Sequence, residues 1–409
     1  MSLTLVICGR DATARTWFDM RGQPLLARHP GRVLLFVDAQ AVGRYPVLPN
    51  CIIEGIEYQS QERMLALARE HHAREGITAV CTLDERSVEF AAQLREALGL
   101  PGMDPALAQR FRDKVVMKQL LGRAGMRVPE FLPLTDGPGV EALLQRHGAL
   151  VVKPRDGLGS RNVSFVRNLD ELARVRAATR DPQNYEAEEF IEGTLYHTNS
   201  VVVDGEVRFT AVAPYLPGMG NIDYTSGTPF VSLMLTEGPL YERLCEFSRQ
   251  AITTLGLVNG VTHLEAFHSS RDEIVFCETA SRPGGGGIVH MIEAQYGVNM
   301  SLAALLSEEG RGQEALAPLH AGERRFGLVG MRNSGMGRVE LSVSERSFSM
   351  DWVHHLQLDV QAGQFRPPSS HCTDFMGLAI IDADDEDQFR SRVGELRQRF
   401  DSVVRLAPL

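Results

Sequence analysis

The sequence predicts a protein of mixed α/β and α+β class with more than one domain. Its 409 residues exceed one ordinary domain and suit two or three. The first hundred residues alternate short β-rich runs with amphipathic helical runs, which is typical of a parallel sheet with helices on both faces. The middle of the chain indicates strand pairs joined by glycine-rich turns. Residues 321–409 indicate strands followed by an amphipathic helix, an α+β arrangement.

Composition limits the classes of function. Hydrophobic residues make up 44% of the chain and charged residues 23%, as in an ordinary globular protein. A formal net charge of -10 argues against a nucleic-acid binder but allows a local basic pocket for a phosphate ligand. The six cysteines lack CxxC spacing, and no segment resembles a membrane span or signal peptide. We therefore expect a cytoplasmic protein with no membrane partner.

The N-terminal region carries the alternating signal. Strands are predicted at residues 3–8, 32–38 and 77–84, and helices at 61–76 and 87–99. The helix over 61–76 is expected to end at Gly76. The sequence GRDA after the first strand lacks the G-x-G-x-x-G pattern, so we expect an ordinary tight turn there rather than a nicotinamide site.

The next unit combines a helix with a glycine-rich hairpin. The segment 111–125 is a predicted helix stopped by Gly125. The segment 149–166, ALVVKPRDGLGSRNVSFV, predicts two strands around a loop that holds Gly157, Gly159 and Ser160, with Lys153 on the approaching strand. Backbone N–H groups in such a loop can cradle phosphate oxygens, although it is not a Walker A loop. A plain hairpin with solvent-facing cations explains this segment equally well.

Two later strands bear glutamates that can converge. Glu265 lies in THLEAF and Glu278 in FCETASRPGGGG, which continues to Arg282 and four glycines, 284–287. Carboxylate oxygens suit Mg²⁺, and a glycine run allows close approach of the backbone to an anion. Arginine is a planar, permanently charged partner for a phosphoryl group. The alternatives are solvated strand residues and a flexible hairpin tip.

The order of these segments resembles the ATP-grasp superfamily, over roughly residues 1–340. Five stretches carry the resemblance: RDKVVMKQLLGRAG, VVKPRDGLGSRNV, EEFIEG, THLEAF and ETASRPGGG. Within the superfamily the chain looks similar to carboxylate-amine ligases that join amino acids into dipeptides. The resemblance implies an ATP-grasp fold with an N-terminal parallel α/β domain at 1–108, a nucleotide-binding core at 109–320 and a C-terminal α+β cap at 321–409. The core would have two subdomains, about 109–190 and 191–320.

The resemblance also implies roles for individual residues. Lys114 and Lys153 would contact the ATP phosphates, under a loop of Gly157, Gly159 and Ser160. Glu265 and Glu278 would hold Mg²⁺, for which Mn²⁺ could substitute, while Arg282, with Lys153, would act in catalysis on the transferred phosphoryl group. The adenine and ribose would meet residues from one segment and the strand after it: Glu188, Glu189, Phe190 and Ile191 for the adenine, and Glu192 or His197 for the ribose.

One position departs from many ATP-grasp ligases. Those enzymes have Glu-x-Asn-x-Arg, in which the asparagine completes a second metal site, whereas this chain has Ala280 there. The dipeptide-forming subgroup is similar to this chain at that place. Two metal ions bridged by Glu278 therefore remain expected, with the second held less securely.

The implied activity is ATP-dependent ligation. A small carboxylate, an amino acid or a related acid, would be activated as an acyl-phosphate and joined to an amine, releasing ADP and phosphate in specialised metabolism such as antibiotic biosynthesis. An ATP-grasp carboxylase, a purine-pathway-type ligase and a non-catalytic nucleotide-binding regulator are the alternatives. A homodimer is left open. The loop 214–229 is expected to be a substrate loop or lid, with a disordered excursion as the alternative.

Overall fold

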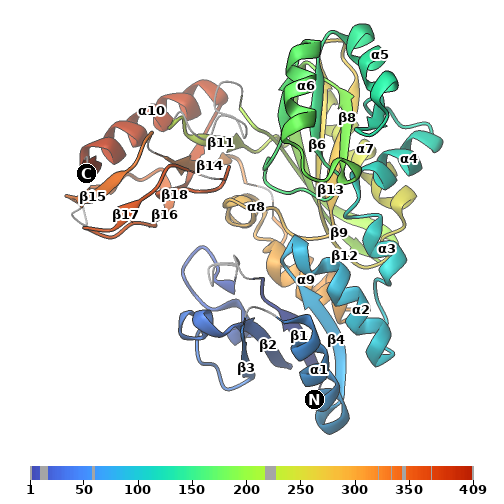
Figure 1. Cartoon of the computed structure of the whole chain (residues 1–409). Coiled ribbons are helices and arrows are strands. Elements are labelled where there is room, and N and C mark those ends of the chain that lie inside the picture. Colours follow the sequence, from blue (N-terminus) through green and yellow to red (C-terminus); the bar gives the residue numbers. More distant parts are fainter. Residues whose placement is uncertain are drawn as a thin grey trace.

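The described residues form four four-stranded sheets, of which the N-terminal one is parallel and the others are antiparallel, and one three-stranded sheet. The sheets form three groups along the chain (Figure 1). This computed structural model describes residues 2–9, 17–57, 60–216, 227–320, 322–332, 334–342, 347–369 and 371–407. Most of the predicted loop 214–229 lies outside the described residues. None of the helices in the described ranges is long and apolar enough to cross a membrane.

The N-terminal sheet is parallel, as predicted, with strand order β3-β2-β1-β4. Its elements are β1 (Leu3–Ile7), β2 (Arg32–Asp38), β3 (Cys51–Ile56), α1 (Gln61–Glu75), β4 (Ile77–Thr82) and α2 (Val88–Leu98). Gly76 ends α1 in the left-handed conformation, with φ of 72°. The carboxyl ends of the strands point toward the centre of the molecule, where the segment after β4 meets the core (Figure 1).

The next sheet is antiparallel and has the order β5-β8-β6-β7. Its strands and the helices around it are α3 (Pro105–Gln109), α4 (Lys114–Arg123), β5 (Phe131–Pro133), α5 (Gly137–His147), β6 (Leu150–Pro154), β7 (Ser164–Val166), α6 (Leu169–Ala178) and β8 (Tyr185–Glu189). The predicted hairpin is the β6–β7 pair. Helix α4 begins later than predicted, at Lys114, because the Asp113 carboxylate accepts hydrogen bonds from the first free backbone N–H groups.

The second antiparallel sheet of the core has the order β10-β9-β12-β13. Its elements are β9 (Gly193–Val203), β10 (Glu206–Pro214), α7 (Pro239–Leu255), β12 (Gly260–Ser269), β13 (Ile274–Ala280), α8 (Ile288–Tyr296) and α9 (Met300–Glu308). Glu265 of β12 stands directly opposite Glu278 of β13 in the register. The strand pairing therefore brings the two glutamates together, as their positions in sequence suggested.

The C-terminal group takes one strand from the core segment. Its larger sheet has the order β11-β14-β18-β16 and its smaller sheet the order β17-β15-β19. The elements are β11 (Phe230–Leu233), β14 (Arg325–Met331), β15 (Gly337–Leu341), β16 (Val353–Leu358), β17 (Phe365–Arg366), β18 (Gly377–Ala383), α10 (Glu386–Val403) and β19 (Val404–Ala407). Strand β11 pairs with β14 because Val231 and Leu233 are buried with the apolar face of α10. The cap sheet therefore begins well before residue 321, where the predicted cap begins.

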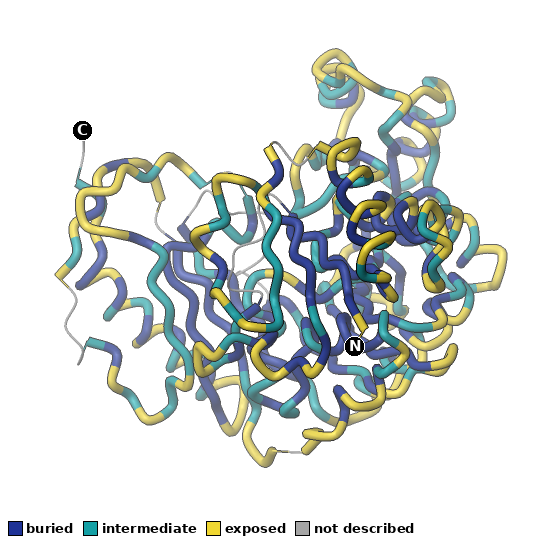
Figure 2. Tube along the Cα trace, turned by 90° about the horizontal axis from the view of Figure 1, so that it is seen from below, coloured by how far each residue is buried: buried dark blue, intermediate teal, exposed yellow. Residues whose placement is uncertain are grey.

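A shared hydrophobic core joins the N-terminal sheet to the rest. Side chains of β1 and β2, such as Val6 and Leu35, are buried in one cluster with Met291 of α8 and Leu305 of α9. Figure 2 shows the buried strands inside and the exposed positions mainly on the outer helices and loops. This packing holds the carboxyl edge of the N-terminal sheet against the core.

Candidate active site

A cavity of about 560 Å³ opens between the two antiparallel sheets of the core. It is lined by all the predicted site residues except His197 and Arg282, namely Lys114, Lys153, Gly157, Gly159, Ser160, Glu188, Glu189, Phe190, Ile191, Glu192, Glu265 and Glu278. The fold thus gathers residues separated by more than 160 positions in the sequence around one space. Its volume is that of a site for a small molecule.

One end of the cavity is apolar and suits a flat ring. Its walls include Val151, Phe165, Phe190, Leu195 and Phe267. The rings of Phe165 and Phe190 meet edge to face, with centroids 5.9 Å apart. Residues of the segment after β8, Phe190, Ile191 and Glu192, line the same cavity. A purine base would find apolar faces here.

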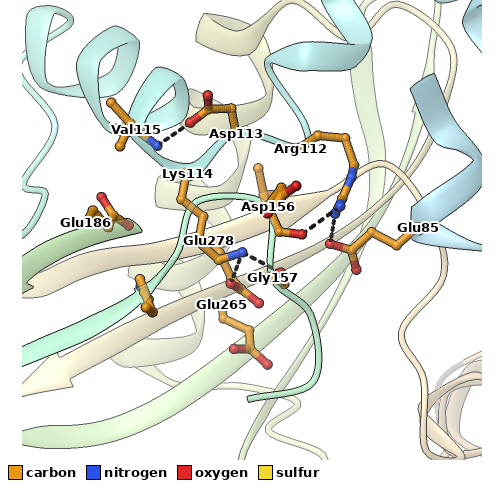
Figure 3. Close-up of polar contacts among 12 residues, drawn as sticks. Glu85, Arg112, Asp113, Lys114, Val115, Asp156, Gly157, Glu186, Glu265 and Glu278 are labelled. Atoms are coloured by element: carbon orange, nitrogen blue, oxygen red, sulfur yellow. Dashed lines mark hydrogen bonds and ion pairs between the residues drawn. The ribbon is translucent and has the colours of Figure 1, made fainter. Parts of the chain in front are cut away.

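The other end is strongly charged, and Lys114 stands at its centre (Figure 3). Its ammonium group donates to the Gly157 carbonyl at 2.7 Å and lies 3.0 Å from a carboxylate oxygen of Glu278. Arg112 donates to the carbonyl of Asp156 at 2.7 Å. The start of α4 therefore holds the base of the glycine loop beside the predicted metal site.

The glycine loop has a tightly turned backbone. Gly159, Ser160 and Asn162 all have positive φ, at 61°, 59° and 58°. A side chain at Gly159 would also collide with the ring of His371, whose Nε2 atom lies 1.7 Å from an ideal Cβ position. The loop tip therefore touches the C-terminal cap, and glycine is required there by both conformation and space. No sequence signal pointed to His371.

Lys153 is buried and charged. Its ammonium group lies 2.5 Å from Glu188, and the other oxygen of that carboxylate lies 2.5 Å from Lys118. Burial acts against both charges, but their attraction outweighs it: the pKa of Lys153 is raised well above its usual value and the pKa of Glu188 is lowered. Both groups are therefore ionised at neutral pH. Sequence reasoning missed Lys118, although it follows Lys114 by one helical turn.

Glu265 and Glu278 form a cross-strand pair of carboxylates. The Tyr215 hydroxyl donates to Glu265 at 2.7 Å, and the Nε2 atom of His263 lies 3.5 Å from the same oxygen. Across the described ranges, no group of three or more His, Cys, Asp or Glu side chains has the arrangement of a metal site. Two hard oxygen donors fit Mg²⁺, which commonly binds through one or two carboxylates and completes its shell with phosphate and water.

Arg282 lies outside the cavity lining and pairs with Glu85. Two of its nitrogens, Nε and Nη2, lie 3.0 and 2.5 Å from one Glu85 oxygen, while Arg112 binds the other at 2.5 Å. Burial acts to raise the pKa of the Glu85 carboxyl, but Arg282 and Arg112 outweigh it and lower that pKa. Sequence reasoning missed Glu85. The sequence feature that could have indicated Glu85 is a carboxylate three residues after the end of β4, at the carboxyl edge of a parallel sheet.

The glycine run is explained by close contacts on both sides. An ideal Cβ at Gly284 would lie 2.9 Å from the Asn199 amide oxygen, and one at Gly287 would lie 2.8 Å from Leu378. Gly286 and Gly287 also have positive φ, at 63° and 93°. Gly287 caps α8 without a side-chain hydrogen bond, and the first N–H group of the helix, that of Ile288, donates to the Gly285 carbonyl at 3.2 Å.

His197 is placed in a buried polar chain rather than at the cavity. It hydrogen-bonds Ser232 and Asn199, each at 2.9 Å, and Asn199 accepts from His263 at 2.9 Å. Burial, with a smaller effect of His263, holds the pKa of His197 well below its usual value, so the ring is neutral. Of the two residues predicted near the ribose, Glu192 lines the cavity and His197 does not.

Known proteins with similar sequences include amino acid ligases. An L-arginine-specific L-amino acid ligase of Bacillus subtilis is 26% identical over 234 residues, which are 54% of this chain and 55% of that protein. Alanine–anticapsin ligase of Bacillus subtilis is 26% identical over 269 residues, 59% of this chain and 56% of that protein. The chain spans about half the length of these curated relatives. No family model matches it.

Solved structures with the same fold cover the whole chain. An L-amino acid ligase from Bacillus licheniformis superposes with a TM-score of 0.79 at 19% identity, over 100% of this chain and 99% of that one. An N5-carboxyaminoimidazole synthase from Aspergillus clavatus in complex with ADP superposes with a TM-score of 0.72 at 14% identity, over 98% and 99%. The predicted fold is thereby confirmed. The chain has the ATP-grasp fold, and its sequence is similar to those of L-amino acid ligases.

Proposed function

We propose that the chain is an ATP-dependent carboxylate-amine ligase. One observation carries the proposal: Lys114, Lys153, Glu265 and Glu278 converge at the charged end of a cavity whose other end suits a purine base. Two lysines and two carboxylates are the groups needed to bind a triphosphate together with Mg²⁺. The similarity to amino acid ligases supports the same conclusion.

The proposed reaction has two steps. A carboxylate oxygen of the substrate attacks the γ-phosphorus of ATP, and ADP leaves, which gives an acyl-phosphate. The amine nitrogen then attacks the acyl carbon, phosphate leaves, and the nitrogen loses a proton as the amide forms. Mg²⁺ would neutralise charge on the transferred group.

The residues have separate tasks in this scheme. Lys114 and Lys153 bind phosphate oxygens, and Glu265 with Glu278 holds the metal. Arg282 would leave Glu85 to meet the transferred phosphoryl group, near the N-terminus of α8. These positions surround the point where negative charge moves from ATP to the acyl-phosphate.

The substrates are proposed to be amino acids or related acids, in specialised metabolism. The relatives named above support this class because both act on amino acids by name. A cytoplasmic location, small-molecule partners and a homodimer remain predictions. A carboxylase or purine-type ligase shares the nucleotide site but is less well supported by the sequence relatives.

An ADP-release assay over pooled amino acids and amines tests the proposed function. We expect ADP release that requires both a carboxylate and an amine, with an amide product detectable by mass spectrometry. Bicarbonate-dependent release would instead identify a carboxylase. ATP binding without turnover in any pool would support the non-catalytic regulator.

The glycine loop is expected to close over the nucleotide. Residues 156–163 should exchange backbone hydrogens rapidly in the free protein and become protected when a non-hydrolysable ATP analogue binds, since glycines at 157 and 159 favour no single conformation. Hydrogen exchange measured by mass spectrometry checks this, with the distant helix α7 as an internal control. Equal exchange in both states would remove the role of the loop as a lid.

A further inference from the structure

Four charged side chains form a continuous chain of ion pairs that runs from the cavity lining into the protein interior. Lys118 of α4 lies 2.6 Å from Glu186 and 2.5 Å from Glu188, both on β8. The second oxygen of Glu188 lies 2.5 Å from Lys153 on β6. Lys118 and Glu186 are 0% exposed, and Glu188 and Lys153 are 4% and 6% exposed. The network has two positive and two negative charges and is neutral as a whole.

The secondary structure places these four groups together. Glu186 and Glu188 are two residues apart on β8 and so share a face of the sheet, and Lys153 is the register partner of Glu186 on β6. Lys118 follows Lys114 by four residues on α4, so both lysines lie on one face of that helix. The Lys118 ammonium also lies 4.6 Å from the ring centre of Phe131.

Only half of the network reaches the cavity. Lys153 and Glu188 are lining residues, whereas Lys118 and Glu186 lie behind them. Glu188 is shared between the two lysines, one on each oxygen. Glu186 contacts Lys118 through one oxygen, while its other oxygen, Oε1, is buried with no hydrogen-bond partner among the described residues. Lys153 is thus paired with Glu188 inside the cavity lining, and Glu188 is in turn paired with Lys118 behind the lining.

We infer that Lys118 and Glu186 are positioning residues that set how much of the Lys153 charge is available to the nucleotide phosphates. The inference rests on the proposed nucleotide site. Neither residue would touch the ligand. Lys118 compensates the second carboxylate, so that Lys153 need not neutralise both Glu186 and Glu188 and can share its charge with an incoming phosphate.

The sign of each effect follows from charge balance in a buried site. Without Lys118, two buried carboxylates would compete for Lys153, and the cavity floor would become more negative beside the phosphates. Without the Glu186 charge, the network would gain a net positive charge and Lys153 would be held less tightly. Both changes break a buried ion pair and lower the stability of the fold. They should nevertheless act on phosphate binding in opposite directions.

The test compares Lys118→Met, Glu186→Gln and the double variant with the parent protein. Calorimetry gives the Kd of the ATP analogue AMP-PNP with Mg²⁺ and of adenosine, which lacks phosphates, and thermal melting gives Tm. We expect Lys118→Met to weaken AMP-PNP binding by about tenfold, from the loss of one nearby buried charge, with adenosine unchanged within about twofold. Glu186→Gln should bind AMP-PNP at least as tightly as the parent. The double variant should return close to the parent.

A matched control breaks a different buried ion pair. Arg95→Met removes the partner of Glu308, 2.6 Å away and outside the cavity lining. It should lower Tm without changing the Kd of AMP-PNP. If Lys118→Met fails to fold, Glu186→Gln and the double variant still carry the test.

The outcomes separate this inference from the proposed function. If Glu186→Gln and Lys118→Met both weaken AMP-PNP binding in step with their loss of Tm, or if adenosine binding falls equally, the network only maintains the fold and the inference is wrong. If the parent itself binds no AMP-PNP, the proposed nucleotide site is wrong. Opposite signs with constant adenosine binding support both.

Discussion

Glu278→Gln is expected to fold normally and to lose turnover by orders of magnitude. The substitution removes one of the two carboxylates available for Mg²⁺ and also the charge that lies 3.0 Å from Lys114. Without the cation, negative charge in phosphoryl transfer meets too little compensation. Steady-state ADP release over a range of Mg²⁺ concentrations, beside a thermal melt, measures both parts of the expectation.

Glu273→Gln serves as the control for this experiment. Glu273 lies in the same hairpin between β12 and β13, but it is exposed and does not line the cavity. It should keep the activity of the parent. If Glu278→Gln also kept full activity, Glu278 would not be a metal ligand.

Arg282→Lys is expected to bind ATP within a few-fold of the parent and to lose about a hundredfold or more in kcat, as after removal of one preorganised donor. Before substrates bind, Arg282 is paired with Glu85, so it contributes little to nucleotide affinity. Its proposed contact exists only with the transferred phosphoryl group. Lysine keeps the charge but not the two-pronged geometry that a phosphoryl group favours.

Nucleotide titration beside single-turnover product formation distinguishes the two roles. Arg243→Lys is the matched control, because Arg243 forms an exposed pair with Asp272 at 2.7 Å, and it should leave both quantities unchanged. A large loss of ATP affinity in Arg282→Lys with kcat preserved would make Arg282 a ground-state nucleotide clamp. The proposed mechanism for the segment ETASRPGGGG would then be wrong.

Local patterns predicted much of the fold because strong signals coincided. The apolar run at 3–8 and the helix that ends at Gly76 appear where periodicity and capping residues indicated. The β6–β7 hairpin and the Glu265–Glu278 pair were also expected, since adjacent antiparallel strands bring together residues close in sequence. These elements depend mainly on short-range constraints.

Long-range pairings could not be predicted in the same way. Glu85 meets Arg282 across 197 positions, and Lys118 meets Glu186 across 68, contacts that only the folded chain creates. The sequence does not distinguish an exposed lysine on a helix from a buried one. The burial of Lys118 could therefore not be predicted. The sequence around His197 indicates a strand, but only the packed sheet shows that the His197 ring is fully buried.

The transfer of a carboxylate oxygen to phosphate tests the central claim most directly. The carboxylate substrate that supports ADP release is labelled with ¹⁸O in its carboxyl group, and the phosphate formed in the reaction is analysed by mass spectrometry. Attack of that oxygen on the γ-phosphorus predicts one ¹⁸O atom in each phosphate released, with ADP unlabelled. Unlabelled phosphate, or label in AMP, would contradict an acyl-phosphate and with it the proposed ligase.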